Sequence, residues 1–275
     1  TGRAKSFPFD MAAATVPHLA GLAPAPISAA TTPTGDTDMP TYLHRKSEDR
    51  GRADHGWLKA THSFSFGNYY DPKIMGFRAL RVINEDRIAG GGGFPTHPHD
   101  NMEIITIPLE GAVAHKDSMG NSGIITAGEV QVMSAGTGIT HSEFNHHGDQ
   151  DLRLFQIWVF PKEKNIKPRY EQQTYNALDR VNKFQTVVAP DDDNAVWINQ
   201  DAWFSLGDFD ASQTQTYNLH KSGGGVYVIV VNGQVKIGDQ ELGARDAIAI
   251  SETDAFEFTA TAKSSLLLIE VPMQW

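Results

Sequence analysis

Short β-like runs separated by glycine, asparagine and aspartate turn clusters recur along this chain, and they limit its possible folds more than any other feature of the sequence. A first set lies between Tyr42 and about Pro161 and consists of FRALRVI, MEIITIPL, EVQVMSA and LRLFQIWVF. Runs of this length bounded by turn residues are typical of antiparallel strands. The first set therefore predicts an antiparallel sandwich or barrel.

A second set of similar runs follows in the C-terminal half: KFQTVV, GVYVIVV, QVKIG, AIAIS, FEFTAT and SSLLLIEV. Turn pairs such as Asn232-Gly233 and Gly238-Asp239 separate some of them. The segment between the sets, KEKNIKPRYEQQTYNALDR, is charged and poor in strands, with a short helix expected near 176–180. The sequence thus predicts an all-β chain with an N-terminal barrel over 41–165 and, over 166–275, a linker and a C-terminal barrel.

Residues 1–40 differ from the rest of the chain because alanine, threonine and proline dominate them. Pro17, Pro24, Pro26 and Pro33 interrupt both helix formation and the apolar part of any export signal. We therefore expect 1–40 to be a leader or tail outside the fold, with Met39 as a candidate natural start.

Composition narrows the possible partners. The chain has 33 acidic against 23 basic residues and a net charge of −10, which disfavours direct binding to nucleic acid or to an anionic membrane. No apolar run approaches the roughly 18 residues that a membrane helix needs. The absence of cysteine excludes disulfides, thiolate metal sites and a cysteine nucleophile, and it suits the cytoplasm, where we expect the protein. The acidic composition favours a small neutral or aromatic ligand over nucleic acid or an anionic membrane.

Two pairs of residues carry the expected chemistry: His97 and His99 in GGGFPTHPHDNMEII, and His141 and Glu143 in SAGTGITHSEFN. On a strand, side chains at i and i+2 leave the same face, so each pair can aim both donors at one point. Two such pairs facing each other across a barrel would hold one divalent iron, manganese, cobalt, nickel, copper or zinc ion. Such an ion would keep coordination positions open for water or substrate. The alternative is chance clustering of histidines satisfied in a core or loop.

The carboxylate ligand is ambiguous from the residues alone. If alternation runs on without interruption from His97, Glu103 shares the face of the histidines and competes with Glu143. Other histidines have a structural interpretation: His115 is expected in a turn and His146-His147 in a polar loop. The second half offers no paired ligands, so we expect its barrel to be structural or regulatory.

Longer stretches resemble one family. RGRADHGWLKATHSFSFGNYYDP, MGFRALRVINEDRI, THPHDNMEIIT, LEGAVAHKDSMGN and SAGTGITHSEFN resemble the pirin family of the cupin superfamily, particularly its bacterial quercetinase-like members. The resemblance implies a bicupin, two antiparallel jelly-roll barrels face to face with few short helices. It implies a metal site in the N-terminal barrel only, no other cofactor site, and the ligands His97, His99, His141 and Glu143. Glu103 then becomes a neighbour that could orient an imidazole.

The resemblance also implies a reaction. A quercetin 2,3-dioxygenase uses a metal ion, with iron(II) expected first and zinc, manganese, cobalt, nickel or copper as alternatives, to cleave the heterocycle of a flavonol with O2. Glu143 is the candidate catalytic base, and Phe94, Met133 or Phe155 are candidate apolar walls for a flat substrate. One alternative is a metal-dependent, redox-sensing co-regulator that binds a protein partner without turnover. Another is a different small-molecule cupin reaction, such as sugar isomerisation.

Overall fold

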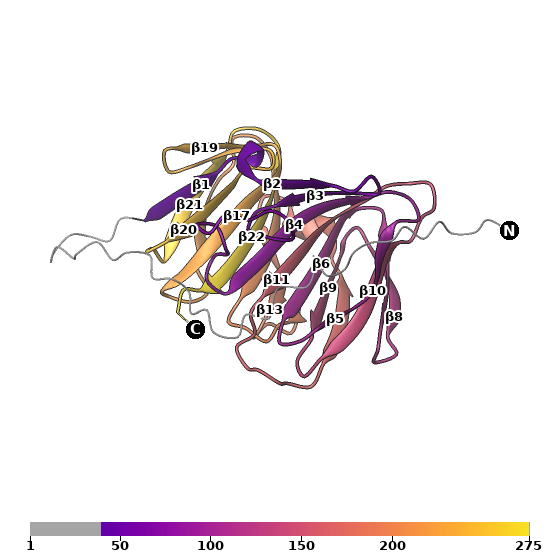
Figure 1. The fold of residues 1–275 in the computed structure, drawn as a ribbon. Coiled ribbons are helices and arrows are strands. Elements are labelled where there is room, and N and C mark those ends of the chain that lie inside the picture. Colours follow the sequence, from indigo (N-terminus) through magenta and orange to yellow (C-terminus); the bar gives the residue numbers. More distant parts are fainter. Residues whose placement is uncertain (1–39, 275) are drawn as a thin grey trace.

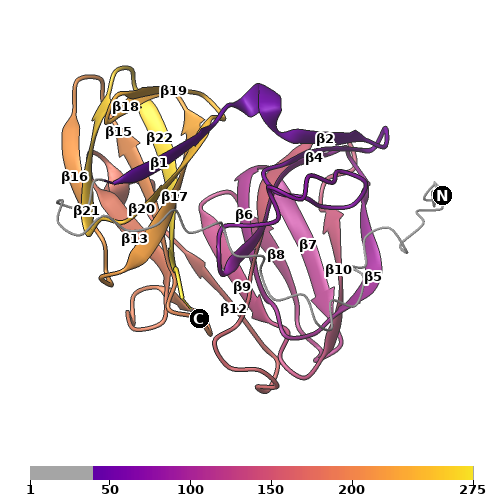
Figure 2. The ribbon, with the colours of Figure 1, turned by 60° about the vertical axis from the view of Figure 1, so that its left-hand side comes forward.

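The computed structural model describes residues 40–274 as two β lobes (Figures 1 and 2). The predicted leader therefore lies outside the described residues, except for Pro40. The N-terminal lobe combines a seven-stranded sheet, ordered β12-β9-β6-β11-β4-β3-β2, with a four-stranded sheet, ordered β5-β10-β7-β8. Their bounds are β2 Gly51–Asp54, β3 Leu58–His62, β4 Leu80–Ile88, β5 Gly93–His99, β6 Glu103–Glu110, β7 Ala112–Asp117, β8 Ser122–Thr126, β9 Glu129–Ser134, β10 Ile139–Asn145, β11 Leu152–Val159 and β12 Arg169–Thr174.

The C-terminal lobe repeats this plan with sheets ordered β1-β20-β17-β22-β15-β13-β14 and β16-β21-β18-β19. Its bounds are β1 Thr41–Arg45, β13 Phe184–Ala189, β14 Val196–Trp197, β15 Trp203–Phe209, β16 Thr214–Asn218, β17 Gly224–Asn232, β18 Gln234–Ile237, β19 Gln240–Gly243, β20 Ala247–Ser251, β21 Ala255–Ala260 and β22 Ser264–Pro272. The helices in the described chain are two 3-10 turns, η2 Ser47–Asp49 and η3 Ala177–Arg180, and the side chain of Asn176 caps the second.

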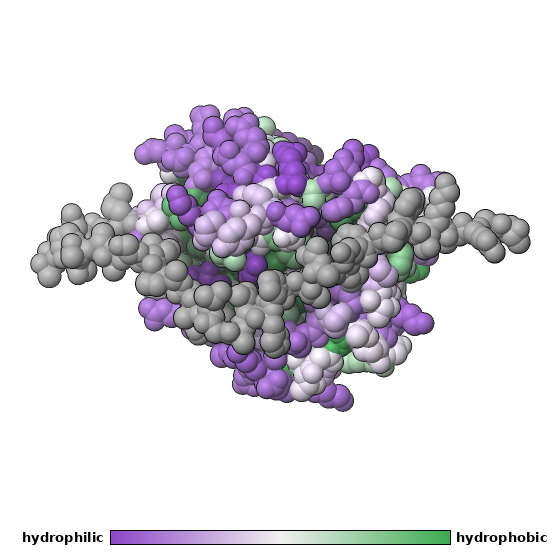
Figure 3. Space-filling view, in the orientation of Figure 1, coloured by the Kyte–Doolittle hydropathy of each residue, from purple (hydrophilic) through white to green (hydrophobic). Residues whose placement is uncertain are grey.

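The largest core lies between the two seven-stranded sheets. Strand alternation produces it, because Ile105 and Ile107 of β6 point toward the other lobe while Ile104 and Thr106 point into their own barrel. Ile105 joins one buried cluster with residues of the facing sheet such as Phe204 and Ile269. On the face shown in Figure 3 the visible surface is mainly hydrophilic, as expected when apolar side chains face inward. The predicted all-β bicupin with face-to-face barrels is confirmed.

Two strands cross between the halves of the chain. β1 pairs with β20 in the C-terminal sheet, and β12, from the charged segment between the two sets of runs, pairs with β9 in the N-terminal sheet. Each crossing strand gives a partner to a strand that would otherwise be an exposed edge. The domain division at 165 stays a prediction, and the sheets do not follow one cut in the sequence. No helix in the described residues is long and apolar enough to span a membrane.

Candidate metal centre

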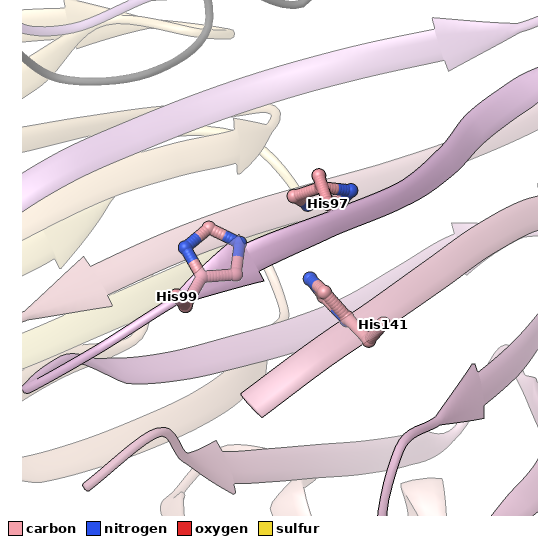
Figure 4. Close-up of side chains that lie close together, drawn as sticks. All are labelled: His97, His99 and His141. Atoms are coloured by element: carbon pink, nitrogen blue, oxygen red, sulfur yellow. The ribbon is translucent and has the colours of Figure 1, made fainter. Parts of the chain in front are cut away.

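Three histidines converge where β5 lies beside β10. In the antiparallel register His97 stands opposite His141, and His99, two residues further along β5, leaves the same face. One ring nitrogen from each lies within 4.8 Å of the others, and the rings gather at one point in Figure 4. The structure thus brings together the three histidines singled out from the sequence, and their role as ligands stays a prediction.

Two observations test whether a metal ion fits these residues. Nδ1 of His97 lies 2.8 Å from the carbonyl oxygen of Pro95, and since a carbonyl only accepts, Nδ1 donates and Nε2 keeps its lone pair. His141 is 2% exposed, and its Nε2 is buried without a hydrogen-bond partner among residues 40–274. Buried polar atoms rarely stay unpaired, so an unpaired nitrogen aimed at two other imidazoles fits a cation.

Two of the imidazoles, those of His99 and His141, are held neutral. Burial, with the neighbouring His141 and His97, lowers the pKa of His99 to about 3. Burial, with His97 and His115, lowers the pKa of His141 to about 2. Metal ligands must be deprotonated, so these histidines need lose no proton at neutral pH before binding an ion. Neutral nitrogen donors in a low-dielectric barrel suit a divalent first-row metal.

Glu143 lies in the same barrel interior, 4% exposed, on the other side of a β-bulge from His141. Its Oε1 accepts from Oγ1 of Thr106 at 3.2 Å, and its Oε2 accepts from Nε2 of Gln156 at 2.7 Å. Its oxygens do not belong to the group of donor atoms within 4.8 Å of one another. Glu143 as a ligand and as a catalytic base therefore stays a prediction, and two donors fix its orientation.

Glu103 does not share the face of the histidines, and that expectation is wrong. β5 ends at His99, and Asn101 takes a left-handed φ of 44° in the turn, so alternation is interrupted before β6 begins. Oε2 of Glu103 accepts from Oγ of Ser134 at 2.7 Å and from the backbone N–H of Asn199 in the other lobe at 3.1 Å. Burial raises its pKa to about 6. Glu103 therefore lies between the two lobes. None of its hydrogen bonds within residues 40–274 goes to an imidazole.

Sequence reasoning missed His115. It lies in β7, not in a turn, it is 2% exposed, and its Nε2 is 3.2 Å from Nδ1 of His141. Tyr170 of β12 stacks on its ring, with centroids 4.9 Å apart and planes at 29°. The available signal was the apolar run AVA directly before His115, which continues a strand.

Buried polar side chains complete the barrel interior. Thr106, Gln131 and Gln156 are buried, and each interrupts an apolar strand sequence, which is a usable signal because such residues are mostly exposed. Asp86 is also buried, and burial, with Glu143 and Glu85, raises its pKa to about 7. These residues give the barrel interior a polar half.

Apolar side chains lie on the His99 side of the site. Trp158 meets the ring of His99 edge-on, with centroids 4.9 Å apart. Met133, one of the expected walls, packs in the same buried cluster as Trp158 and Ile104. Phe155 instead belongs to the core between the lobes, and Phe94 packs with Trp57 elsewhere in the barrel.

The fold and the site together define a two-domain cupin whose N-terminal barrel carries a histidine cluster suited to a metal ion. The Pirin family matches residues 44–159, and the family described as quercetinase C-terminal cupin domain matches residues 186–271. The chain belongs to the pirin family. The resemblance predicted from its motifs is confirmed.

Similar proteins cover nearly the same span. The chain is 46% identical over 236 residues to a protein of Escherichia coli named quercetin 2,3-dioxygenase, covering 84% of this chain and 98% of that protein. It is 43% identical over 231 residues to a pirin-like protein of Caulobacter vibrioides, covering 83% and 99%. The solved structure of the bacterial pirin YhhW from Escherichia coli in complex with nickel(II) superposes with a TM-score of 0.80 at 43% identity, covering 84% and 99%.

Proposed function

We propose that this chain is a metal-dependent dioxygenase that cleaves the heterocycle of a flavonol such as quercetin with O2. The convergence of three imidazoles, with the unpaired Nε2 of His141 among them, carries the proposal. His97, His99, His141 and Glu143 would hold one divalent ion. Iron(II) is our first candidate, and the nickel complex of a relative supports a first-row ion in general. The names of the relatives support the flavonol substrate.

Different residues of the site have different roles in the proposed reaction. When bound, the ion would act as a Lewis acid that lowers the proton affinity of the 3-hydroxyl oxygen of the flavonol. Glu143 accepts the proton of that hydroxyl on a carboxylate oxygen, and Thr106 and Gln156 hold the carboxylate in one orientation. Trp158, which meets the ring of His99 edge-on, offers apolar surface for a flat aromatic ring, and the buried Met133 packs in the same cluster behind it.

We place this reaction in the cytoplasm, in keeping with a chain that lacks cysteine. The substrates are then a small aromatic molecule and O2, and the net charge of −10 disfavours nucleic acid as a partner. The competing function, a metal-dependent co-regulator with a protein partner, uses the same histidines without turnover.

The test begins with elemental analysis of protein purified without added metal. The protein is then loaded with iron(II), or with each other first-row ion, and mixed with quercetin in air. We expect the flavonol absorption band to decay with matching oxygen uptake, and His141→Ala to lose both bound metal and decay. A protein that binds metal through these histidines and leaves quercetin intact with every ion would overturn the dioxygenase and favour the co-regulator.

A further inference from the structure

His115 stands directly behind one of the three converging imidazoles. β7 pairs with β10 so that His115 lies opposite Glu143, which puts its side chain on the face that also carries His141. Nε2 of His115 is 3.2 Å from Nδ1 of His141, and both rings are 2% exposed. The contact occupies Nδ1 of His141 and leaves its Nε2, which has no hydrogen-bond partner among residues 40–274, available to an ion.

We propose that His115 is a positioning residue that accepts the Nδ1–H of His141 and so leaves the lone pair of His141 Nε2 for a metal ion. This inference rests on the metal site proposed above. It assigns a role to a residue that lies outside the group of converging donor atoms.

The two tautomers of the pair support this role. With the shared proton on Nδ1 of His141, Nε2 of His141 has a free lone pair and Nδ1 of His115 carries the other proton. With the shared proton on Nε2 of His115, the remaining proton of His141 sits on Nε2 and blocks coordination there. Both outer nitrogens are buried without a partner among the described residues, so hydrogen bonding inside the protein does not favour either arrangement. A cation at Nε2 of His141 is compatible only with the first.

Tyr170 fixes the ring of His115. Its phenol ring stacks on the imidazole, and its Oη donates to Oε1 of Gln172 at 2.6 Å. Nε2 of Gln172 donates in turn to the carbonyl of Ile124 on β8. The crossing strand β12 therefore joins the edge of the four-stranded sheet through Gln172 and holds His115 at a fixed distance from His141. Groups that support a metal-bound imidazole in this way commonly affect affinity as strongly as tenfold to a hundredfold.

Matched variants test the hydrogen bond. His115→Phe keeps a ring against Tyr170 but removes the acceptor, whereas His115→Gln restores an acceptor oxygen. His62→Phe is the control, because His62 is another buried histidine of the same barrel whose Nδ1 bonds Asn84 instead of a candidate ligand. Cobalt(II) affinity is measured by chelator competition and the visible spectrum of the bound ion is recorded, with thermal unfolding of each metal-free variant as a check of folding.

We expect His115→Phe to weaken cobalt(II) binding by about tenfold to a hundredfold and to shift its visible bands. His115→Gln should regain most of the affinity, and His62→Phe should bind as the unmodified protein does. Equal losses in His115→Phe and His62→Phe, or unchanged binding by His115→Phe, would overturn the inference. Unchanged binding by His141→Ala would instead overturn the metal site itself.

The hydrogen bond between His115 and His141 can also be tested on the unmodified protein, where the result does not depend on whether a variant folds. Long-range proton–nitrogen NMR of the zinc-loaded protein reads the protonation of each ring nitrogen. We expect a proton on Nδ1 of His141 and zinc on its Nε2. Zinc on Nδ1, or a proton on Nε2 of His115 pointing at His141, would overturn the proposal.

Discussion

At the scale of the residue, Glu143 combines a buried carboxylate with two fixed donors, Thr106 and Gln156. Glu143→Gln keeps the size of the side chain and removes its charge and its ability to take a proton. We expect flavonol turnover to fall by about 100-fold or more, while the three histidines retain metal. Initial rates and metal content per chain measure the two effects. Glu110→Gln, which changes an exposed glutamate on β6, is the control. Complete loss of metal from Glu143→Gln would show that the carboxylate is an indispensable ligand.

Single residues also show what the sequence could predict. His97, His99 and His141 were found because i and i+2 spacing on a strand is a local property, and one antiparallel pairing then brings them together. Glu103 was misplaced because the position of a turn decides its face, and three residues between two strands reset the alternation. His115 was missed because its partner, His141, lies 26 residues away and on another strand.

At the scale of the element, the turn between β9 and β10 sets the start of the strand that carries His141. Gly136 has a φ of 49°, and a Cβ there would lie 2.1 Å from the carbonyl oxygen of Ile166. The backbone N–H of Thr137 donates to that same oxygen at 3.0 Å, and the carbonyl of Gly136 accepts from the N–H of Asn101 in the turn after β5. The turn therefore ties together both strands of the candidate site and the segment that leads to β12.

Gly136→Ala should disrupt the two backbone hydrogen bonds that this turn makes to Ile166 and Asn101. The left-handed backbone and the overlap with Ile166 predict a loss of about 2–4 kcal/mol in the free energy of unfolding. Weaker metal binding should accompany it, because β10 would shift. Urea unfolding and chelator competition measure the two. Gly148→Ala is the control, because a Cβ at Gly148 would meet nothing within 4 Å, and a change within about 0.5 kcal/mol is expected. Equal stability of the two variants would contradict this account of the turn.

The positions of the strands were easier to predict than the pairing of the strands in the sheets. The runs around Ile105, Phe155 and Val228 predicted strands from composition and bounding turns alone. The exchange of β1 and β12 between the lobes was not predictable, because pairing between distant segments depends on which sheet edges the rest of the fold leaves open. Tyr170 reaches the candidate site only through that exchange.

At the scale of the whole molecule, Glu103 links the two lobes beside the candidate site. It starts β6, is fully buried, and accepts a hydrogen bond from the backbone of Asn199. Nearby, the carboxylate of Asp201 in the C-terminal lobe accepts from Lys162, which follows β11 of the N-terminal lobe, and also pairs with Lys221. Buried and exposed polar contacts thus hold the lobes in one arrangement, in addition to the apolar core.

The buried carboxyl group of Glu103 predicts how the free energy of unfolding depends on pH. Its pKa is raised from 4.5 to about 6 in the folded chain, chiefly by burial, so the folded state holds the proton more tightly than the unfolded state does. The contribution of Glu103 to the free energy of unfolding is fully present below pH 4.5. It falls as the pH rises to about 6 and is constant above that pH. The total fall is about 2 kcal/mol. Ser134, Asn199 and Arg169 favour the charged form and keep the fall from being larger.

Glu103→Gln isolates this contribution, because the difference between the two proteins cancels other titrating groups such as Asp86. From pH 4 to pH 7 we expect the variant to gain about 2 kcal/mol of stability relative to the unmodified chain, with the change concentrated between pH 4.5 and pH 6. Urea unfolding at half-unit steps of pH measures it. Glu110→Gln, the exposed glutamate at the other end of β6, controls for the loss of one carboxylate. A Glu103→Gln difference that does not change with pH would contradict this account, because it would mean that the pKa of Glu103 is the same in the folded and unfolded chains.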